Sequence, residues 1–329
     1  MYSLRVVGIL ACLVCVAALE LNAQTCCSGG VPLSGNIGFD GADRGTFQLE
    51  LSYDLNVLAT LKNGAEVYDD EARERITQSV LMKTGYSLTS WMALDAIISY
   101  VWQSRTISYQ GAVTNDRTNG PGDAVVMAKF VVSRLGENGT EIQLGAGPKI
   151  PVGRSDLPDG RGITLNADLQ PGSGSWDLIT WGYFLRQLKA KPTAVFSLRL
   201  VGRVNGTNQK YLGNELYKFG NSFQAYAGIG DQFLLIGRVF SASLSFSYRL
   251  SFANRINGIL LDNTGGRWMN IIPSFGWNIG PNSLIQLVPE IPVISRVEGI
   301  QLTPTFRIQA GIYHRFGGRK INQIKTFQL

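Results

Sequence analysis

The 329-residue sequence is poor in charge, in histidine and in cysteine. Charged residues make up 16% of the chain, against about 25% in typical soluble proteins. A single histidine, His314, leaves no histidine cluster for a metal site and weakens any serine–histidine hydrolase interpretation. After residue 23 no window of about 18 uncharged apolar residues occurs. The sequence therefore predicts no transmembrane helix in the mature chain.

The one long apolar run lies at the N-terminus and is typical of a secretory signal. Apolar residues fill positions 6–19, and the small residue Ala23 fits a cleavage site. We therefore expect residues 1–23 to be a cleaved signal peptide. Its removal leaves only Cys26 and Cys27. Their adjacency allows a strained vicinal disulfide or a redox role, and the surrounding glycines favour a simple lead-in segment.

Alternation of apolar and polar residues is the strongest pattern in the rest of the chain. Residues 240–252, FSASLSFSYRLSF, place seven apolar side chains on one face of a strand and serines with Arg249 on the other. The same alternation marks segments near the length that a tilted strand needs to cross a bilayer. The predicted strands are 44–57, 75–88, 91–104, 123–134, 140–152, 176–188, 193–204, 220–230, 233–252, 267–279, 284–294 and 303–316.

The connections between these strands alternate between long and short. The long ones are 58–74, 105–122, 153–175, 205–219, 253–266 and 295–302, and the short ones are 89–90, 135–139, 189–192, 231–232 and 280–283. A soluble sandwich has no reason to sort its connections in this way, whereas outer-membrane barrels have short periplasmic turns and longer external loops. The composition of residues 69–80 is compatible with a short helix in the first long connection, and we treat this segment as part of the loop.

These patterns together predict the fold class and the location of the chain. We expect an all-β, antiparallel up-and-down transmembrane barrel of about twelve strands in the bacterial outer membrane, formed by residues 44–316. The last strand must pair with the first, because an open sheet edge is not tolerated in hydrocarbon. We expect residues 317–329 to be a basic periplasmic tail. Tryptophans toward the strand ends are typical of interfacial girdles; they are Trp91, Trp102, Trp181, Trp268 and Trp277.

Two parts of the sequence resemble known outer-membrane proteins. Residues 309–316, QAGIYHRF, resemble the terminal-strand signal that the outer-membrane insertion machinery recognises. Within residues 120–185, the segments GPGDAVVMAKFVV, GAGPKIPVGRSDLPDG and LQPGSGSWDLITWGYF resemble the phenol-degradation (MetA-pathway) outer-membrane transporter family. This resemblance implies a passive channel for small hydrophobic or aromatic compounds, surrounded by outer-membrane lipid. By similarity to the fatty-acid channel group, residues 24–43 are a candidate lumen plug.

The polar strand faces carry the candidate constriction residues of such a channel. Those near mid-height are Glu50, Lys83, Lys129, Arg199, Glu290 and Gln309. A wider count gives eight basic residues (Lys83, Arg105, Lys129, Lys149, Arg199, Arg203, Arg249, Arg307) and five acidic ones (Glu50, Asp54, Asp95, Glu141, Glu290). The basic surplus favours anions, including carboxylates. Charge reversal at Lys129 or Arg199 is expected to alter ion selectivity.

Two alternative functions stay open at this point. The same charges fit ion pairs that hold together a closed structural or assembly barrel, because pairing is the default for buried charge. The other alternative is a lipid-modifying outer-membrane enzyme, but His314 is predicted to face lipid, so no catalytic residue is assigned. We expect no enzyme activity, no cofactor and no metal. The scattered basic residues do not indicate a nucleic-acid partner.

Overall fold

The computed structural model describes residues 43–68, 72–109, 111–134 and 139–317. Across these residues the chain is all-β, and its one helical element is the 3-10 turn η1 (Ala167–Leu169). No helix in this part of the chain is long and apolar enough to cross a membrane. The expected signal peptide, Cys26, Cys27 and nearly all of the candidate plug and basic tail lie outside the described residues.

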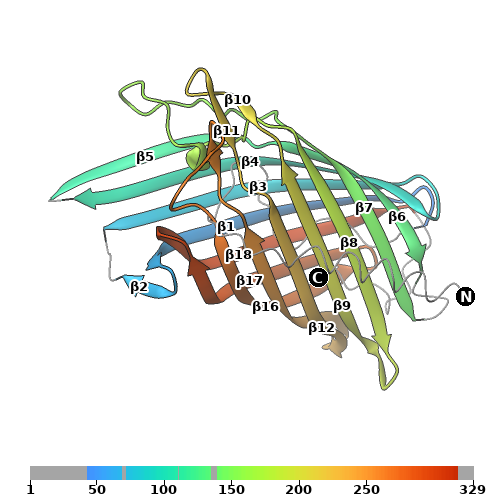
Figure 1. The fold of residues 1–329 in the computed structure, drawn as a ribbon. Coiled ribbons are helices and arrows are strands. Elements are labelled where there is room, and N and C mark those ends of the chain that lie inside the picture. The colour runs from blue at the N-terminus through green and yellow to red at the C-terminus, as the bar shows by residue number, and fades with distance from the viewer. Residues whose placement is uncertain (1–42, 69–71, 110, 135–138, 318–329) are drawn as a thin grey trace, which may run out of the picture.

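Twelve antiparallel strands close into a barrel (Figure 1). Its wall consists of β1 (Phe47–Asn63), β3 (Arg73–Ser87), β4 (Met92–Tyr109), β6 (Ala124–Ser133), β7 (Thr140–Ile150), β8 (Asp177–Leu188), β9 (Lys191–Asn205), β12 (Ser222–Leu235), β13 (Arg238–Ser251), β16 (Gly266–Gly280), β17 (Ser283–Val297) and β18 (Ile300–Phe316). The last strand, β18, pairs with β1 from Phe47 opposite Phe316 to Asn63 opposite Ile300. Closure pairs the edge amides, so the predicted barrel is confirmed.

In the wall strands the polar side chains are buried and the apolar side chains are exposed, which is the reverse of a soluble protein. In β1, Glu50 is 1% exposed whereas its neighbour Leu51 is 48% exposed. In β13, Ser245 is 8% exposed and Phe246 is 58% exposed. The alternation therefore turns polar side chains into the barrel and apolar side chains outward, which is the arrangement of a barrel surrounded by lipid.

Short turns gather at one end of the barrel, the turn end, and long connections at the other, the loop end. The turn-end connections are residues 88–91, 134–139, 189–190, 236–237 and 281–282. At the loop end, the predicted long connection 295–302 is wrong. Strands β17 and β18 both extend, which leaves only Glu298 and Gly299 between them. Gly299 has a φ of 62° there, a left-handed conformation that suits glycine.

Several other predicted loop-end segments are β-structure. The described part of the segment 69–80 is strand and not loop, because β3 begins at Arg73 and is held between β1 and β4. Segment 105–122 forms a hairpin of β4 with β5 (Ala112–Pro121) that projects beyond the wall (Figure 1). The short strand β2 (Glu66–Tyr68) folds back on β1. A separate four-stranded sheet contains β10 (Asn208–Tyr211), β11 (Glu215–Lys218), β14 (Arg255–Ile256) and β15 (Ile259–Leu260).

Candidate functional site

The six candidate constriction residues face the lumen, and the structure pairs several of them with wall residues. Lys83 lies 2.7 Å from Glu50, and both side chains are almost fully buried. Lys129 lies 2.8 Å from Asp95, again with both side chains buried. Gln309 donates a hydrogen bond to the hydroxyl of Ser52 at 3.0 Å. The residues are thus spread over several strands as local pairs.

One half of the lumen is filled by apolar side chains. A buried cluster from β3, β4, β6, β8 and β9 contains Leu81, Ile97, Val125, Met127, Ile179, Trp181, Tyr183, Leu185, Val195 and Val201. Trp181 and Tyr183 stack with ring centroids 5.7 Å apart. Lys129 lies 5.5 Å from the Trp181 centroid, and Arg199 lies 5.7 Å from that of Tyr183. Lys129 and Arg199 therefore border a packed core.

The other half of the lumen contains a cavity. Its lining comes from six consecutive wall strands, β12, β13, β16, β17, β18 and β1. We call it the lumen cavity; its lining is Asn56, Gln224, Tyr226, Ser247, Arg249, Trp268, Asn270, Glu290, Pro292, Pro304 and Arg307. Serines on β13 and Gly228 on β12 keep this side of the wall thin, because they extend little into the lumen. A second buried apolar cluster, of Leu58, Trp268 and Val297, lies in the same half, so the lumen cavity is a small space beside packed side chains.

A cation on the wall of the lumen cavity pairs with two carboxylates. Arg307 donates to both oxygens of Asp54, at 3.2 and 3.0 Å, and lies 3.7 Å from Glu290. Glu290 also accepts a 2.6 Å hydrogen bond from Asn270. Across the lining, the guanidinium of Arg249 lies 5.3 Å from the Trp268 ring centroid. The lining of the lumen cavity therefore contains both positive and negative side chains.

The predicted basic surplus of the lumen does not describe the folded barrel. Three acidic residues outside that count pair with basic ones inside it: Asp116 with Arg105, Asp123 with Lys149, and Asp177 with Arg203. The count missed them because they lie at strand ends or on the hairpin, away from strand centres. Trp181 and Trp268 are also not girdle residues, because they point into the lumen and are 4% and 2% exposed.

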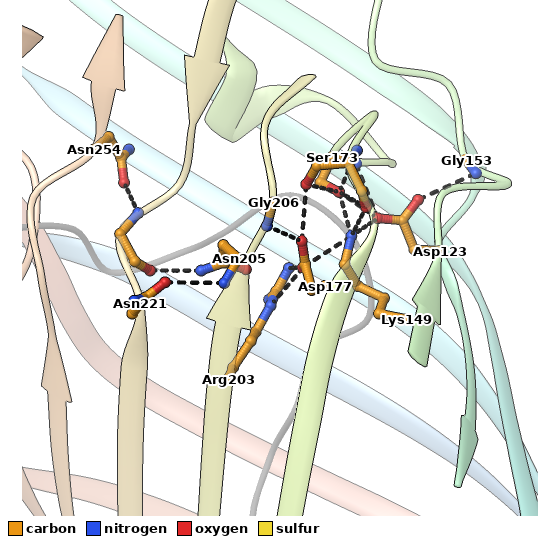
Figure 2. Close-up of polar contacts among 12 residues, drawn as sticks. Asp123, Lys149, Gly153, Ser173, Asp177, Arg203, Asn205, Gly206, Asn221 and Asn254 are labelled. Atoms are coloured by element: carbon orange, nitrogen blue, oxygen red, sulfur yellow. Dashed lines mark hydrogen bonds and ion pairs between the residues drawn. The ribbon is translucent and has the colours of Figure 1, made fainter. Parts of the chain in front are cut away.

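A buried polar network at the loop end anchors residues 151–176, which we call the strap (Figure 2). The ammonium of Lys149 lies 2.6 Å from Asp123 and 3.0 Å from Asp177, and all three side chains have no exposed surface. Arg203 holds Asp177 with two hydrogen bonds of 2.9 and 2.7 Å. Asp123 also accepts the Ser173 backbone N–H at 3.0 Å and its hydroxyl at 2.7 Å. Through Ser173 these contacts tie the second end of the strap to the wall.

Glycines allow the two ends of the strap to touch. A Cβ added to Gly172 would lie 2.4 Å from the backbone of Gly153, and one added to Gly153 would lie 2.8 Å from the Cα of Gly172. Asp123 accepts the Gly153 N–H at 3.2 Å, which links this close approach to the network. The Pro-x-Gly and Gln-Pro-Gly motifs of the sequence therefore meet at the base of the strap.

The far end of the strap reaches over to β3, β4 and β5. Arg75 on β3 lies 2.6 Å from Asp168 in η1 and also bonds its carbonyl oxygen. Gln103 on β4 donates to the Gln170 carbonyl at 3.1 Å, and Thr118 on β5 donates to the Leu169 carbonyl. The strap is therefore attached to the wall at both sides of β6.

The small four-stranded sheet packs against the strap from the other direction. Ala167 of the strap forms a buried cluster with Tyr211, Tyr217 and Phe219. Tyr217 accepts a 2.6 Å hydrogen bond from Asn254, and burial raises the pKa of its hydroxyl above the ordinary value. The tyrosine stays protonated over the physiological pH range. Strap and sheet together form a cover at the loop end (Figure 1).

The only histidine lies away from the lumen and the cover. His314 points outward near the turn end, where its Nδ1 lies 2.7 Å from the Ser283 hydroxyl and its ring lies 4.3 Å from that of Phe316. Among the described residues, no group of three or more His, Cys, Asp or Glu side chains is arranged to hold a metal ion.

Fold and lumen together define a transmembrane twelve-stranded β-barrel with a partly filled interior and a structured cover. No protein-family model and no curated protein sequence matches the chain. Among solved structures, it is similar to the COG4313 outer membrane channel from Pseudomonas putida F1, with a TM-score of 0.67 and 14% sequence identity. That match covers 86% of this chain and 100% of the channel. The likeness shows a shared fold.

More distant structures share less of the architecture. The β domain of the Bordetella autotransporter BrkA has a TM-score of 0.47 and 10% identity, covering 83% of this chain and 100% of that domain. The CymD monoaromatic hydrocarbon channel has a TM-score of 0.38 and 10% identity, covering 87% of this chain and 94% of that channel.

Proposed function

We propose that the protein is an outer-membrane channel for small hydrophobic or aromatic compounds. The observation that carries this proposal is a closed, apolar-faced barrel whose lumen is lined by polar and charged side chains and keeps a small polar-lined cavity. A structured cover sits over its loop end, which we place outside the cell. The fold shared with the Pseudomonas putida F1 channel supports the channel class. The resemblance within residues 120–185 to the phenol-degradation family supplies the compound class.

In this proposal the strap restricts entry to the lumen at its outer end. Its base is held by the fully buried network around Lys149, so we expect the base to stay in place. Its far end is held by the hydrogen bonds from Gln103 and Thr118 and by the ion pair of Arg75 with Asp168, whose side chain is 28% exposed. A solvent-accessible ion pair is weaker than a buried one because water competes for both charges. The far end is therefore the part of the cover that opens.

The test is single-channel conductance of the refolded mature protein in planar bilayers. Asp168→Asn removes the ion pair with Arg75 at nearly constant volume, and we expect it to increase open probability. Asp156→Asn is the matched control, because Asp156 lies in the same strap and pairs only with the exposed Arg154 in the contacts described. A third form without residues 24–43 tests the candidate plug. Absence of conductance in all three variants and in the wild type would overturn the channel proposal.

A closed structural barrel is the second candidate function. It is favoured by the filled half of the lumen and by the buried pairs of Lys83 with Glu50 and Lys129 with Asp95. The same conductance series separates the two candidates, since a structural barrel stays silent after the strap is released. Retained folding of each variant is checked by the shift in electrophoretic mobility that barrels show on heating.

A further inference from the structure

Two arginines lie directly opposite each other on the outward face of the barrel wall. Strands β16 and β17 are neighbours (Figure 1), and their register places Arg267 opposite Arg296. The next outward pair on these strands is Met269 with Ile294, whose side chains are 45% and 53% exposed. Both arginines are exposed and lie two residues from that apolar pair, on the same face. They therefore belong to the surface that contacts lipid.

The two arginines lie where the apolar band of the wall ends at the loop end. Near the turn end of β16, the outward ring of Trp277 stacks on Phe240. From Trp277 to Arg267 the strand rises by about 33 Å at ~3.3 Å per residue. A strand tilt of about 40° reduces this to about 25 Å along the membrane normal, which is the height of the apolar band in outer-membrane barrels. Arg267 is thus at the level of the lipid headgroups in the leaflet at the loop end.

Neither arginine has a counter-charge among the described residues. No ion pair and no side-chain hydrogen bond joins Arg267 or Arg296 to another residue in this part of the chain. The nearest carboxylates along the chain belong to Asp262 and Glu298, which are exposed and lie in the connections next to these strands. Like charges directly opposite each other on adjacent strands destabilise a sheet. The folded barrel therefore keeps an unfavourable contact that a bound anion would relieve.

From this geometry we infer that Arg267 and Arg296 form a binding site for a phosphate group of an anionic lipid in the outer leaflet. A guanidinium bonds phosphate oxygens through two parallel N–H groups, and two guanidinium groups on neighbouring strands can hold one phosphate between them. The acyl chains of the same lipid would lie below the phosphate, along Met269 and Ile294. The site is on the outside of the wall, so it does not depend on whether the lumen conducts.

The bound lipid would also strengthen a sparsely paired part of the wall. β17 pairs with β18 only as far as Glu290 opposite Arg307, and in the described ladders its later residues pair with β16 alone. Arg296 lies in that later part. A phosphate held by both arginines would link β17 to β16 through their side chains as well. We therefore expect the lipid to raise the temperature at which the barrel unfolds.

The experiment uses the full mature chain, refolded in non-ionic detergent without divalent cations, with diphosphoryl lipid A as the probe. Native mass spectrometry gives the dissociation constant of the first bound lipid. We expect Arg267→Gln and Arg296→Gln each to weaken binding by about threefold and the double variant by about tenfold, the range for exposed charge pairs. The double variant should also lose the rise in unfolding temperature that the lipid gives the wild type. If it does not fold, the double lysine variant replaces it, and loss of the planar forks should still weaken binding.

Arg238→Gln is the matched control. Arg238 is also exposed and lies 5.5 Å from the ring centroid of Trp277, but it is at the turn end, in the other leaflet. Its substitution should leave the dissociation constant unchanged. Equal affinity of the wild type and the double variant, or an equal loss in Arg238→Gln, would overturn the site. Displacement of the lipid by inorganic phosphate at the same concentration would also overturn it, because the arginines would then bind a free anion and not a lipid.

Discussion

Removing the ammonium of Lys149 should destabilise the barrel by several kilocalories per mole. Lys149→Met leaves Asp123 and Asp177 fully buried beside an apolar side chain. Breaking a buried ion pair by deleting one partner costs about 3–5 kcal/mol. Asp177 keeps its two hydrogen bonds from Arg203, and Asp123 keeps those from Ser173. We therefore expect a loss near the lower limit, about 3 kcal/mol of unfolding free energy.

The assay is urea unfolding of the protein in lipid vesicles, followed by tryptophan fluorescence. Lys191→Met is the control, because Lys191 also pairs with an aspartate, Asp231, but its side chain is 62% exposed. An exposed pair contributes less than about 1 kcal/mol. Trypsin should also cleave faster after Arg161, which is exposed in the strap, once the base is loosened. If both lysine variants lose the same free energy, the buried network does not anchor the strap.

Two further predictions concern backbone space and pH. Gly147→Ala should impair folding, because the added Cβ would lie 1.9 Å from the Val126 carbonyl oxygen. In the control Gly182→Ala, the added Cβ meets no atom closer than 3.8 Å, so this variant should fold normally. The yield of heat-modifiable, folded barrel after refolding compares the two variants, and equal yields would contradict the clash. Asp159 accepts backbone N–H bonds, first that of Ile163, which lowers the pKa of its carboxyl below the ordinary value of 3.8. The ionised carboxylate therefore stabilises the turn above pH 3.8, and this stabilisation is lost as the pH falls through the lowered pKa of Asp159. The amide resonance of Ile163 should report the titration below pH 3.8, and in Asp159→Asn it should no longer change with pH.

Alternation was sufficient to predict the wall and which side chains face inward. In β1 and β13 every second residue is apolar, and the period of two assigns each to one face without knowledge of the neighbours. It was less informative where a strand is irregular. The register of β17 against β16 shifts between Met269 and Asn270, which changes the face on which later residues of β17 fall. The sequence pattern therefore predicts a loop where the structure continues β17 to Val297.

The candidate site was only partly predictable for a related reason. Sequence position identified Lys129 and Glu290 as lumen residues, but it does not tell which strands stand opposite one another. The filled half and the lumen cavity arise from contacts between strands distant in the chain. In β8, apolar residues occupy both faces, so Trp181 and its neighbours gave no alternation from which to infer an inward direction. The strap contacts of Arg75 depend on a loop conformation that periodicity does not encode.

The network at the base of the strap is separate from the lumen cavity. Asp123, Lys149, Ser173 and Asp177 come from three Gly-rich segments between residues 120 and 185, and all four build the strap base (Figure 2). None of them lines the lumen cavity. Substitutions in these segments would therefore change how firmly the cover is held at the mouth of the barrel and leave the lining of the lumen cavity as it is.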